Sequence, residues 1–477
     1  MFEHHDTSLA TRRFHLIGVG GAGMSVVAEL LADRGAQVSG SDREASRVTE
    51  HLADLGVKVS IGHDAAHVPS DATVVVSTAI RPSNPELAIA RTRGQEVIHR
   101  SEALALAATG LSFVAVAGAH GKTTTSGMLA VALGQAGRDP SVAVGGVLPE
   151  YGSGAHLGSG DVFVAEADES DGSFVNYQPS VAIVTNVEPD HLDRYGTRDA
   201  FEAVFVDFAR RIVPGGQLIV CAEDAGAVRL AQSARDLGIR VVSYGRGPQS
   251  LEEPSVLVSD VELSREGSRF TLSLACADPD VSGIPPTDVE LSVPGEHNVL
   301  NAAAVWAAGV ALGVSPEQMA RGLSAFTGTV RRFEFRGEVA GRRLFDDYAH
   351  HPTEVAAAIR QARLVAGSGT VTVVFQPHLY SRTRIFADDF ARSLALADTV
   401  IVTDIYAARE DPEPGLDSSV ISRKIPGAVF IPDMHEAARV AASTVPRDGI
   451  LVTMGAGSVT TCGEDVLRAW SQELEEA

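Results

Sequence analysis

The stretch VAVAGAHGKTTTSGMLA (114–130) runs from an apolar strand through a Gly-Lys-Thr turn into a helix. In such a unit, backbone amides at the start of the helix surround phosphate groups. Lys122 is placed to reach β- and γ-phosphate oxygens, and the Thr123 hydroxyl to bind Mg²⁺. The strict pattern has glycine where this chain has Val116, but the shorter form keeps the amides, the lysine and the hydroxyl. We therefore predict an ATP site rather than a structural turn with an incidental lysine. Its residues are Gly118, Ala119, His120, Gly121, Lys122, Thr123 and Thr124.

An earlier stretch, FHLIGVGGAGMSVVAELLADRG (14–35), has the same strand–turn–helix pattern with glycines alone. Glycines let the backbone approach a diphosphate, and Asp42, at the end of the next strand, is placed to hold a ribose hydroxyl. A tight turn in an ordinary α/β sheet is the alternative. The pattern indicates a diphosphate nucleotide but does not separate NAD from a nucleotide sugar. The glycines concerned are Gly18, Gly20, Gly21 and Gly23.

Two acidic segments, FVAEADESDGSF (163–174) and TNVEPDHLD (185–193), each continue an apolar strand. Acidic residues at the end of a buried strand beside a triphosphate are typical cation ligands, although a solvated acidic loop is the alternative. His191 paired with Glu166 could hold a second divalent ion, Mg²⁺ or, because an imidazole is present, Mn²⁺. The predicted metal ligands are Thr123, Glu166 and His191.

The composition limits the class of protein. The chain has 477 residues, 45% apolar and 21% charged, with a net charge of −22. Such a charge excludes nucleic acid or an anionic membrane as the main partner, since either needs a basic face. Three scattered cysteines, no apolar core near the first residues and a longest apolar run of only 302–313 favour a soluble cytoplasmic protein. The oligomeric state, monomer or homodimer, stays open.

Short Val/Ile-rich strands alternate with helical stretches in three series, which predicts three consecutive α/β domains with mostly parallel sheets. The boundaries fall near residues 110 and 328. Between about 255 and 294 the pattern changes to alternating strands, which predicts an antiparallel patch on the second domain. Helices are expected from Asn298 to about Phe326.

Further motifs follow in order along the chain. They are STAI (77–80), GEHNVLNAAA (295–304), VRRFEFRG (330–337), DDYAHHPTE (346–354), FQPHLYSRT (375–383), IYAARE (405–410) and MGAGSV (454–459). Together with the two glycine loops and the acidic segments, they resemble the Mur ligase family over essentially the whole chain. The forms GGAGMS and DDYAHHPTE resemble the alanine-adding branch.

This resemblance implies three domains. They are a Rossmann-like N-terminal domain (1–109) that binds a UDP-sugar, a P-loop ATPase-like central domain (110–328) that binds ATP, and a Rossmann-like C-terminal domain (329–477). The last would bind the amino acid and close over ATP. The implied activity is an ATP-dependent ligase that joins L-alanine to the carboxylate of UDP-N-acetylmuramate through an acyl phosphate. That reaction belongs to cytoplasmic peptidoglycan synthesis, and so to cell wall biogenesis, cell shape and cell division.

The resemblance also implies roles for individual residues. UDP-sugar binding falls to Gly18, Gly20, Gly21, Gly23, Asp42, Ser77, Thr78, Ala79 and Ile80. ATP binding adds His297, Asn298, Asn301, Arg332 and Asp347 to the phosphate loop. The amino acid is assigned to Tyr348, His350 and Arg382. The catalytic group comprises Lys122, Glu166, His191, Arg332 and His350.

Two features of the chain bear on this assignment. Relatives often have arginine where this chain has Leu379, so the amino-acid carboxylate would rest on Arg382 with less help. The segment 194–215 contains no lysine, as expected for the alanine-adding branch, whereas other ligases of the family carry a carbamylated lysine.

Three alternatives stay open. The first is a nicotinamide-dependent oxidoreductase with a nucleotide-regulated second domain, which leaves the acidic segments unexplained. The second is a non-catalytic, nucleotide-gated binding module. The third, within the ligases, is an enzyme that re-attaches a recycled peptide to the same nucleotide sugar, and its amino-acid pocket would have to admit a tripeptide.

Overall fold

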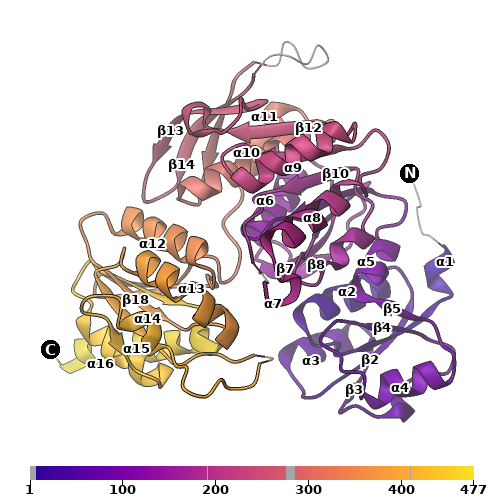
Figure 1. Cartoon of the computed structure of the whole chain (residues 1–477), viewed down its shortest axis with the longest axis horizontal. Helices are drawn as coiled ribbons and strands as arrows, with labels where there is room; N and C mark the ends of the chain where they lie inside the picture. Colours follow the sequence, from indigo (N-terminus) through magenta and orange to yellow (C-terminus); the bar gives the residue numbers. More distant parts are fainter. Residues whose placement is uncertain (1–6, 191, 276–284, 409, 477) are drawn as a thin grey trace. The chain divides into compact units, whose positions relative to one another are not determined.

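The computed structural model describes residues 7–190, 192–275, 285–408 and 410–476 (Figure 1). The chain divides into two compact units. The first comprises Met1–Asp260, Phe270–Val289 and Leu300–Phe326, and the second comprises Val261–Arg269, Glu290–Val299 and Thr327–Ala477. The predicted fold class, three consecutive α/β domains, is confirmed: the described residues form three sheets, each combined with helices.

The N-terminal sheet has five strands in the order β3-β2-β1-β4-β5, all parallel. Its central strand β1 is buried at four of five positions, because helices cover both faces of a parallel sheet. The strands are β1 Arg13–Ile17, β2 Gln37–Asp42, β3 Lys58–Ile61, β4 Thr73–Val76 and β5 Val97–His99. The helices are α1 Thr7–Ala10, α2 Ala22–Asp33, α3 Arg47–Asp54, η1 Ala65–His67, α4 Pro85–Thr92 and α5 Arg100–Ala107.

The central sheet has ten strands in the order β15-β14-β13-β12-β11-β10-β6-β9-β7-β8. The strands are β6 Ser112–Ala117, β7 Ser141–Leu148, β8 Ser153–His156, β9 Val162–Glu166, β10 Val181–Val184, β11 Gln217–Cys221, β12 Arg240–Gly245, β13 Val256–Leu263, β14 Ser268–Leu274 and β15 Thr287–Leu291. The helices are α6 Lys122–Gln135, η2 Ser173–Asn176, α7 Leu192–Tyr195, α8 Arg198–Ala209, α9 Ala225–Asp236, η3 Gly247–Gln249, α10 Glu296–Ala311 and α11 Pro316–Ser324. Strand β6 pairs in parallel with β9 on one side and β10 on the other, so the loops after these three strands meet at one edge.

The third sheet has six strands in the order β16-β17-β21-β18-β19-β20, and only β16 runs antiparallel to its neighbour among the described strands. Buried residues of α12, α13 and α14 pack on one face and those of α15 and α16 on the other (Figure 1). The strands are β16 Glu334–Val339, β17 Arg342–Asp347, β18 Val371–Phe375, β19 Thr399–Val402, β20 Val429–Phe430 and β21 Ile450–Met454. The helices are α12 Pro352–Ala366, α13 Tyr380–Leu394, α14 Ser419–Ser422, α15 Met434–Thr444, η4 Ser458–Cys462 and α16 Gly463–Glu476.

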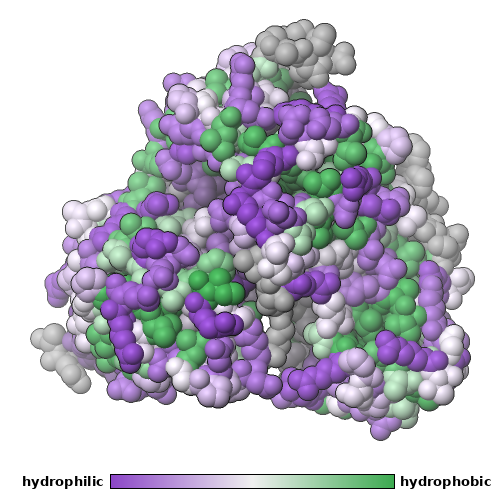
Figure 2. All heavy atoms as spheres, in the orientation of Figure 1, coloured by the Kyte–Doolittle hydropathy of each residue, from purple (hydrophilic) through white to green (hydrophobic). Residues whose placement is uncertain are grey.

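The surface mixes polar and apolar side chains on the face drawn in Figure 2. Within the part of the chain that the structure describes, no helix combines the length and the apolar content needed to cross a membrane.

Candidate active site

The phosphate loop after β6 has a backbone that only glycine adopts easily. Gly118 has a φ of +132° and Gly121, the N-cap of α6, a φ of +81°. A Cβ at position 118 would overlap the Thr185 hydroxyl. The Asn186 side chain, which follows β10, accepts from His120 N and donates to His120 O, both at 3.0 Å. The loop is therefore fixed to the end of the neighbouring strand before any phosphate arrives.

Lys122 points back over this loop. Its Nζ donates to Gly118 O at 2.6 Å and to the two carboxylate oxygens of Glu169 at 2.8 and 3.0 Å. Burial alone would lower the pKa of Lys122, but the nearby carboxylates of Glu169 and Asp168 outweigh it and raise the pKa. The ammonium group is thus charged at neutral pH and placed among the loop carbonyls, where a triphosphate would compete with Glu169 for it.

The predicted metal ligands Thr123 and Glu166 lie on adjacent elements. Thr123 is in the first turn of α6, and Glu166 ends β9 at the position paired with Val116 of β6. A hydroxyl and a carboxylate are the hard oxygen donors that Mg²⁺ prefers, so these two residues fit the ion. His191 lies outside the described residues, so its role stays a prediction.

Two acids of the run after β9, Asp168 and Asp171, contact side chains of the N-terminal domain, which the sequence did not indicate. Asp168 pairs with Arg100 at 2.7 Å, and Asp171 lies 3.4 Å from His99 Nε2 and accepts from the Thr78 hydroxyl at 3.3 Å. Hydrogen bonds and Arg100 hold the pKa of Asp171 well below its usual range, against the effect of burial. We expected this run to bind cations, but these carboxylates instead bind side chains of the N-terminal domain, one of them in the predicted sugar-binding turn.

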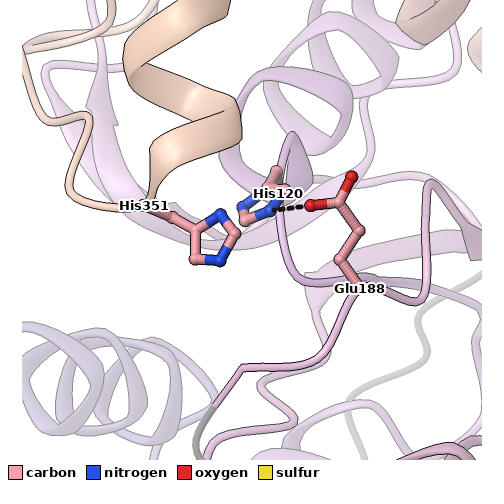
Figure 3. A group of neighbouring side chains, drawn as sticks. All are labelled: His120, Glu188 and His351. Atoms are coloured by element: carbon pink, nitrogen blue, oxygen red, sulfur yellow. Dashed lines mark hydrogen bonds and ion pairs between the residues drawn. The ribbon is translucent and has the colours of Figure 1, made fainter. Parts of the chain in front are cut away.

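His120 of the phosphate loop is positioned by a side-chain contact in addition to the backbone hydrogen bonds with Asn186. Its Nε2 lies 3.2 Å from the Glu188 carboxylate, which comes from the loop after β10 (Figure 3). Glu188 was not among the residues predicted for the site. It stands in the acidic segment 185–193, and the spacing alone does not tell which of its acids faces the phosphate loop.

The glycine turn of the N-terminal domain also has a defined geometry. Gly18 has a φ of +78°, and Gly21 is the N-cap of α2. Asp42 accepts a hydrogen bond from Gly20 N at 2.8 Å, so one of its oxygens shapes the turn itself. A Cβ at Gly23 would lie 2.9 Å from Arg100 Nη1, which places that guanidinium beside the start of α2. Arg100 is thus a neighbour of the turn that the motif did not reveal.

The predicted sugar-binding turn Ser77–Ile80 lies beside these glycines. A Cβ at Gly18 would lie 3.5 Å from Ile80 Cδ1, an ordinary contact distance. Ser77 and Ala79 belong to the same turn after β4. The structure therefore brings the glycine turn and this segment together, and the contact of either with a UDP-sugar stays a prediction.

A buried carboxylate, Glu86 at the start of α4, organises the same edge of the sheet. It is fully buried, accepts from the Ser41 hydroxyl at 2.6 Å and from Asp64 N at 3.1 Å, and lies 3.4 Å from His15 Nε2. Burial raises the pKa of Glu86, but the His15 and Ser41 hydrogen bonds outweigh it and lower the pKa. In the sequence Glu86 looks like an ordinary acid in a first helical turn, so only the fold identifies it.

The residues predicted near the ATP base lie at the start of α10. Burial lowers the pKa of His297 to about 4, so its ring is neutral near pH 7. Asn298 donates to Pro294 O at 2.8 Å, while its buried Oδ1 has no hydrogen-bond partner among the described residues. Asn301 packs against the phosphate loop, since a Cβ at Gly121 would lie 3.1 Å from its Oδ1. An unsatisfied buried oxygen is the feature expected where a ligand supplies a donor.

In the second unit, Arg332 lies in the segment before β16, and Asp347 is the last residue of β17. The Arg332 guanidinium lies 5.1 Å from the centre of the Tyr348 ring and 3.8 Å from a Glu354 oxygen. Asp347 is buried and accepts from Phe333 N and Ala349 N, at 2.8 and 2.7 Å. Because both carboxylate oxygens hold backbone amides, the geometry favours a positioning role for Asp347 over a direct ribose contact.

Three residues are predicted to bind the amino acid. Tyr348 and His350 follow β17, and Arg382 lies in α13. His350 Nδ1 lies 3.0 Å from Tyr348 O, and because a carbonyl only accepts, Nδ1 carries the hydrogen. The neutral ring then has its lone pair on Nε2. Arg382 is buried at 5% exposure, and Leu379, the N-cap of α13, has a φ of +69°.

Backbone strain gathers in these loops of the second unit. Arg331, Phe333, Leu379 and Ala408 all have positive φ, a conformation that non-glycine residues rarely adopt. Such strain persists only where surrounding structure holds it, and it is frequent at functional sites. The positions are consistent with a functional edge on the third sheet.

Asp347 predicts a pH dependence of stability. Burial raises the pKa of Asp347 to about 6 in the folded chain, against a usual 3.8. Between these values the folded chain binds more protons than the unfolded one, so stability falls as the pH rises from about 4 to about 6. Relative to Asp347→Asn, the wild type should lose up to about 3 kcal/mol over this interval in urea unfolding. Parallel pH curves for the two proteins would contradict this origin of the shift.

Gly118→Ala should damage the phosphate loop far more than a matched substitution elsewhere. Gly137 also has a positive φ, +79°, but a Cβ there meets nothing within 4 Å. We expect Gly137→Ala to cost about 1–2 kcal/mol from backbone strain alone. Gly118→Ala adds overlap with Thr185 and should cost more than that and abolish binding of an ATP analogue, measured by calorimetry. Equal effects of the two changes would be inconsistent with this loop geometry.

Comparison with known proteins agrees with the fold. The model described as "Mur ligase family, catalytic domain" matches residues 13–110, that described as "Mur ligase middle domain" matches 116–309, and that described as "Mur ligase, glutamate ligase domain" matches 331–457. The chain belongs to the Mur ligase family.

Individual relatives are similar over nearly the full length. The chain is 51% identical over 462 residues to the UDP-N-acetylmuramate–L-alanine ligase of Kineococcus radiotolerans, covering 95% of each chain. It is 48% identical to the ligase of the same name from Renibacterium salmoninarum, covering 97% of each. Among solved structures, the UDP-N-acetylmuramate–alanine ligase of Thermotoga maritima matches with a TM-score of 0.78 at 27% identity, covering 97% of this chain and 99% of that one. A murein peptide ligase of Psychrobacter arcticus matches with a TM-score of 0.71 at 25% identity, covering 96% and 98%.

Proposed function

We propose that this chain is an ATP-dependent ligase that joins L-alanine to the carboxylate of UDP-N-acetylmuramate in peptidoglycan precursor synthesis. Relatives of about 50% identity over the full chain carry that activity in their names. The structural observation that carries the proposal is the half-buried, charged Lys122 over a glycine loop, with Glu166 on the adjacent strand. This arrangement suits a phosphoryl donor, while a second glycine turn in the N-terminal domain suits the nucleotide sugar. The place of action we propose is the cytoplasm.

The first chemical step would be phosphorylation of the sugar's carboxylate, because a carboxylate does not condense with an amine in water. Transfer of the γ-phosphoryl group needs alignment and positive charge more than covalent help. Lys122 would bind the transferring oxygens after exchanging Glu169 for phosphate, and Arg332 would add a second positive charge. Thr123 and Glu166 would hold Mg²⁺, with His191 as a further ligand, and the bound ion supplies charge that offsets the phosphoryl oxygens.

In the second step the alanine amine would attack the acyl phosphate, and inorganic phosphate would leave. His350 is assigned to the incoming ammonium group, because its Nδ1 donates to Tyr348 O and Nε2 could accept a proton when the ring is neutral. It would either accept a proton from that group or only position it. Arg382, Tyr348 and the cap of α13 would receive the amino acid, with Leu379 giving the pocket an apolar wall.

The proposed residues lie in both units, so the reaction requires the C-terminal domain to close over bound ATP. Lys122 and Glu166 belong to the first unit, and Arg332 and Arg382 to the second. Closure on nucleotide binding is common where a site is completed by two domains. Small-angle scattering should show a more compact particle with ATP analogue and UDP-sugar than without them, and identical curves would contradict closure.

Two alternatives lose support from the comparisons. Membership of a ligase family does not support an oxidoreductase or a non-catalytic binding module. The recycling ligase remains the close alternative, since a murein peptide ligase shares the fold. Curated relatives of 47–51% identity named as L-alanine ligases favour the single amino acid over the peptide.

Phosphate release tests the proposal. The full chain is mixed with ATP, Mg²⁺ and UDP-N-acetylmuramate, and each amino acid, or the tripeptide, is added in turn. We expect release that requires the sugar and is fastest with L-alanine, with the amide product found by mass spectrometry. Release without sugar and without an amino acid would remove the ligase interpretation, and a preference for tripeptide would identify the recycling enzyme.

Selectivity for alanine should be limited. One methyl group in an apolar pocket is worth about 1–3 kcal/mol, so glycine should react with a kcat/KM about 10–200-fold lower than alanine. Serine, which adds one hydroxyl, should be rejected by a comparable factor. The measurement is the same phosphate assay at high amino-acid concentration. Complete absence of turnover with both competitors would mean that the pocket uses a polar contact that we have not identified.

A further inference from the structure

Three metal-ligating side chains meet in the second unit, outside the residues assigned above. His435 is the second residue of α15, Cys462 ends η4, and Asp465 is in the first turn of α16. His435 Nδ1 lies 2.6 Å from Asp465 Oδ2 and 4.0 Å from Cys462 Sγ. The three donor atoms all lie within 4.8 Å of one another. The proposed ligase reaction uses none of them.

The chemistry of this donor set differs from that of the Thr123–Glu166 site. Imidazole nitrogen, thiolate sulfur and carboxylate oxygen together are typical ligands of Zn²⁺, whereas Mg²⁺ takes oxygen ligands. Three protein ligands with water in the fourth position complete a tetrahedral zinc site. The set therefore selects for a thiophilic divalent ion.

The separations are close to those of such a site. With usual bond lengths of about 2.0–2.3 Å in a tetrahedron, ligand nitrogen and sulfur lie about 3.6 Å apart and nitrogen and oxygen about 3.4 Å. The observed nitrogen–sulfur distance is 4.0 Å and the nitrogen–oxygen distance is 2.6 Å. Side-chain rotation would therefore have to move the nitrogen and oxygen apart and bring the nitrogen and sulfur closer together.

The surroundings favour a cation. Cys462 is fully buried beside Val466 and Trp470, and the carboxylates of Asp465 and Asp433 act electrostatically on its thiol. The carboxylates that disfavour a bare thiolate attract a metal ion. The His435 and Asp465 side chains are 45% and 19% exposed, so two of the three ligands are accessible to an ion from solvent.

We propose that His435, Cys462 and Asp465 bind one thiophilic divalent ion of the zinc class, which links α15 to the start of α16. On binding, the thiol proton passes to solvent and a sulfur–metal bond forms. The Nδ1 hydrogen that His435 donates to Asp465 is exchanged through solvent to Nε2, so that Nδ1 and a carboxylate oxygen each form one bond to the ion. The metal site shares no residue with the proposed active site. The metal proposal therefore does not depend on whether the proposed reaction is correct.

Cobalt(II) titration of the full chain tests the site, because a thiolate ligand gives a sulfur-to-cobalt charge-transfer band in the near ultraviolet. The background is Cys221→Ser/Cys276→Ser, which leaves Cys462 as the last thiol in the sequence. We expect the band to saturate at one equivalent and to be displaced by Zn²⁺. The apparent affinity should rise about tenfold per pH unit above neutrality, since one thiol proton is released.

Two further variants locate the ligands. Cys462→Ser and, separately, His435→Ala should each abolish the band, and His435 is exposed enough that its change leaves the fold intact by circular dichroism. Glu166→Gln is the matched control, because it alters the oxygen site and should keep the band. No thiolate band in the starting background, or a band that survives either substitution, would overturn the proposal.

Discussion

Lys122→Met should lower kcat/KM for ATP by about 10²–10³-fold or more, while binding of UDP-N-acetylmuramate to the N-terminal domain stays within a factor of two. The ammonium group is the charge proposed to follow the γ-phosphoryl group, and removing one such preorganised donor has effects of this size. Steady-state phosphate release measures the first quantity and calorimetry measures the second. Loss of sugar binding with ATP hydrolysis retained would mean that the two nucleotide sites are assigned the wrong way round.

The control separates chemistry from folding. Lys122→Met removes the positive charge that pairs with the buried Glu169 carboxylate, which costs about 3–5 kcal/mol of stability. Adding Glu169→Gln removes that charge, so Lys122→Met/Glu169→Gln should recover most of the free energy of unfolding and none of the activity. Recovery of activity in the double variant would show that Lys122 serves only the fold.

Arg332→Ala should lower kcat by about 10²–10³-fold with little change in stability, because the guanidinium contributes charge to the transferring phosphate in the proposed mechanism. Its ion pair with Glu354 spans 3.8 Å, so this pair contributes little to the free energy of unfolding. Arg332→Lys keeps the charge but not the fork of donors, and should recover part of the rate. The measurement is single-turnover phosphate release at saturating ATP.

The preceding arginine provides the matched comparison. Arg331 has a φ of +61°, pairs with buried Asp346 at 3.2 Å and donates to Gly455 O at 2.7 Å. Arg331→Ala should therefore lower the free energy of unfolding by about 3 kcal/mol, since it removes the ion pair of buried Asp346, which keeps the hydroxyl donors of Thr453 and Thr460. Its kcat at a temperature where the protein stays folded should change less than that of Arg332→Ala. The reverse order for the two arginines would contradict the roles given to them.

The parallel strands could be predicted from sequence because strands buried on both faces read as continuous apolar runs. Strands β7 and β8 were not predicted. The run of β7 is interrupted by Gly145 and Gly146, and β8, Ser153–His156, is short and lacks β-branched residues. The sequence predicts further strands on the central domain between about 255 and 294. The structure has β13, β14 and β15 there, and they extend the central sheet.

The sequence predicted which loops form the site, but not which side chains form ion pairs within it. Glycine and lysine spacing located the phosphate loop, because the backbone geometry it requires is local. The partners of Lys122 and Arg100, which are Glu169 and Asp168, lie 47 and 68 residues away in sequence. Which acid in a run of four faces a given cation depends on strand order and register, and these are set by the whole fold.

The most direct test is a crystal structure of the full chain with UDP-N-acetylmuramate and a non-hydrolysable ATP analogue bound together. We predict the sugar's diphosphate over the turn from Gly18 to Gly23 and the triphosphate over the loop from Gly118 to Thr123, with Lys122 released from Glu169. Both ligands competing for one pocket, or a nicotinamide over the first glycine turn, would contradict the account.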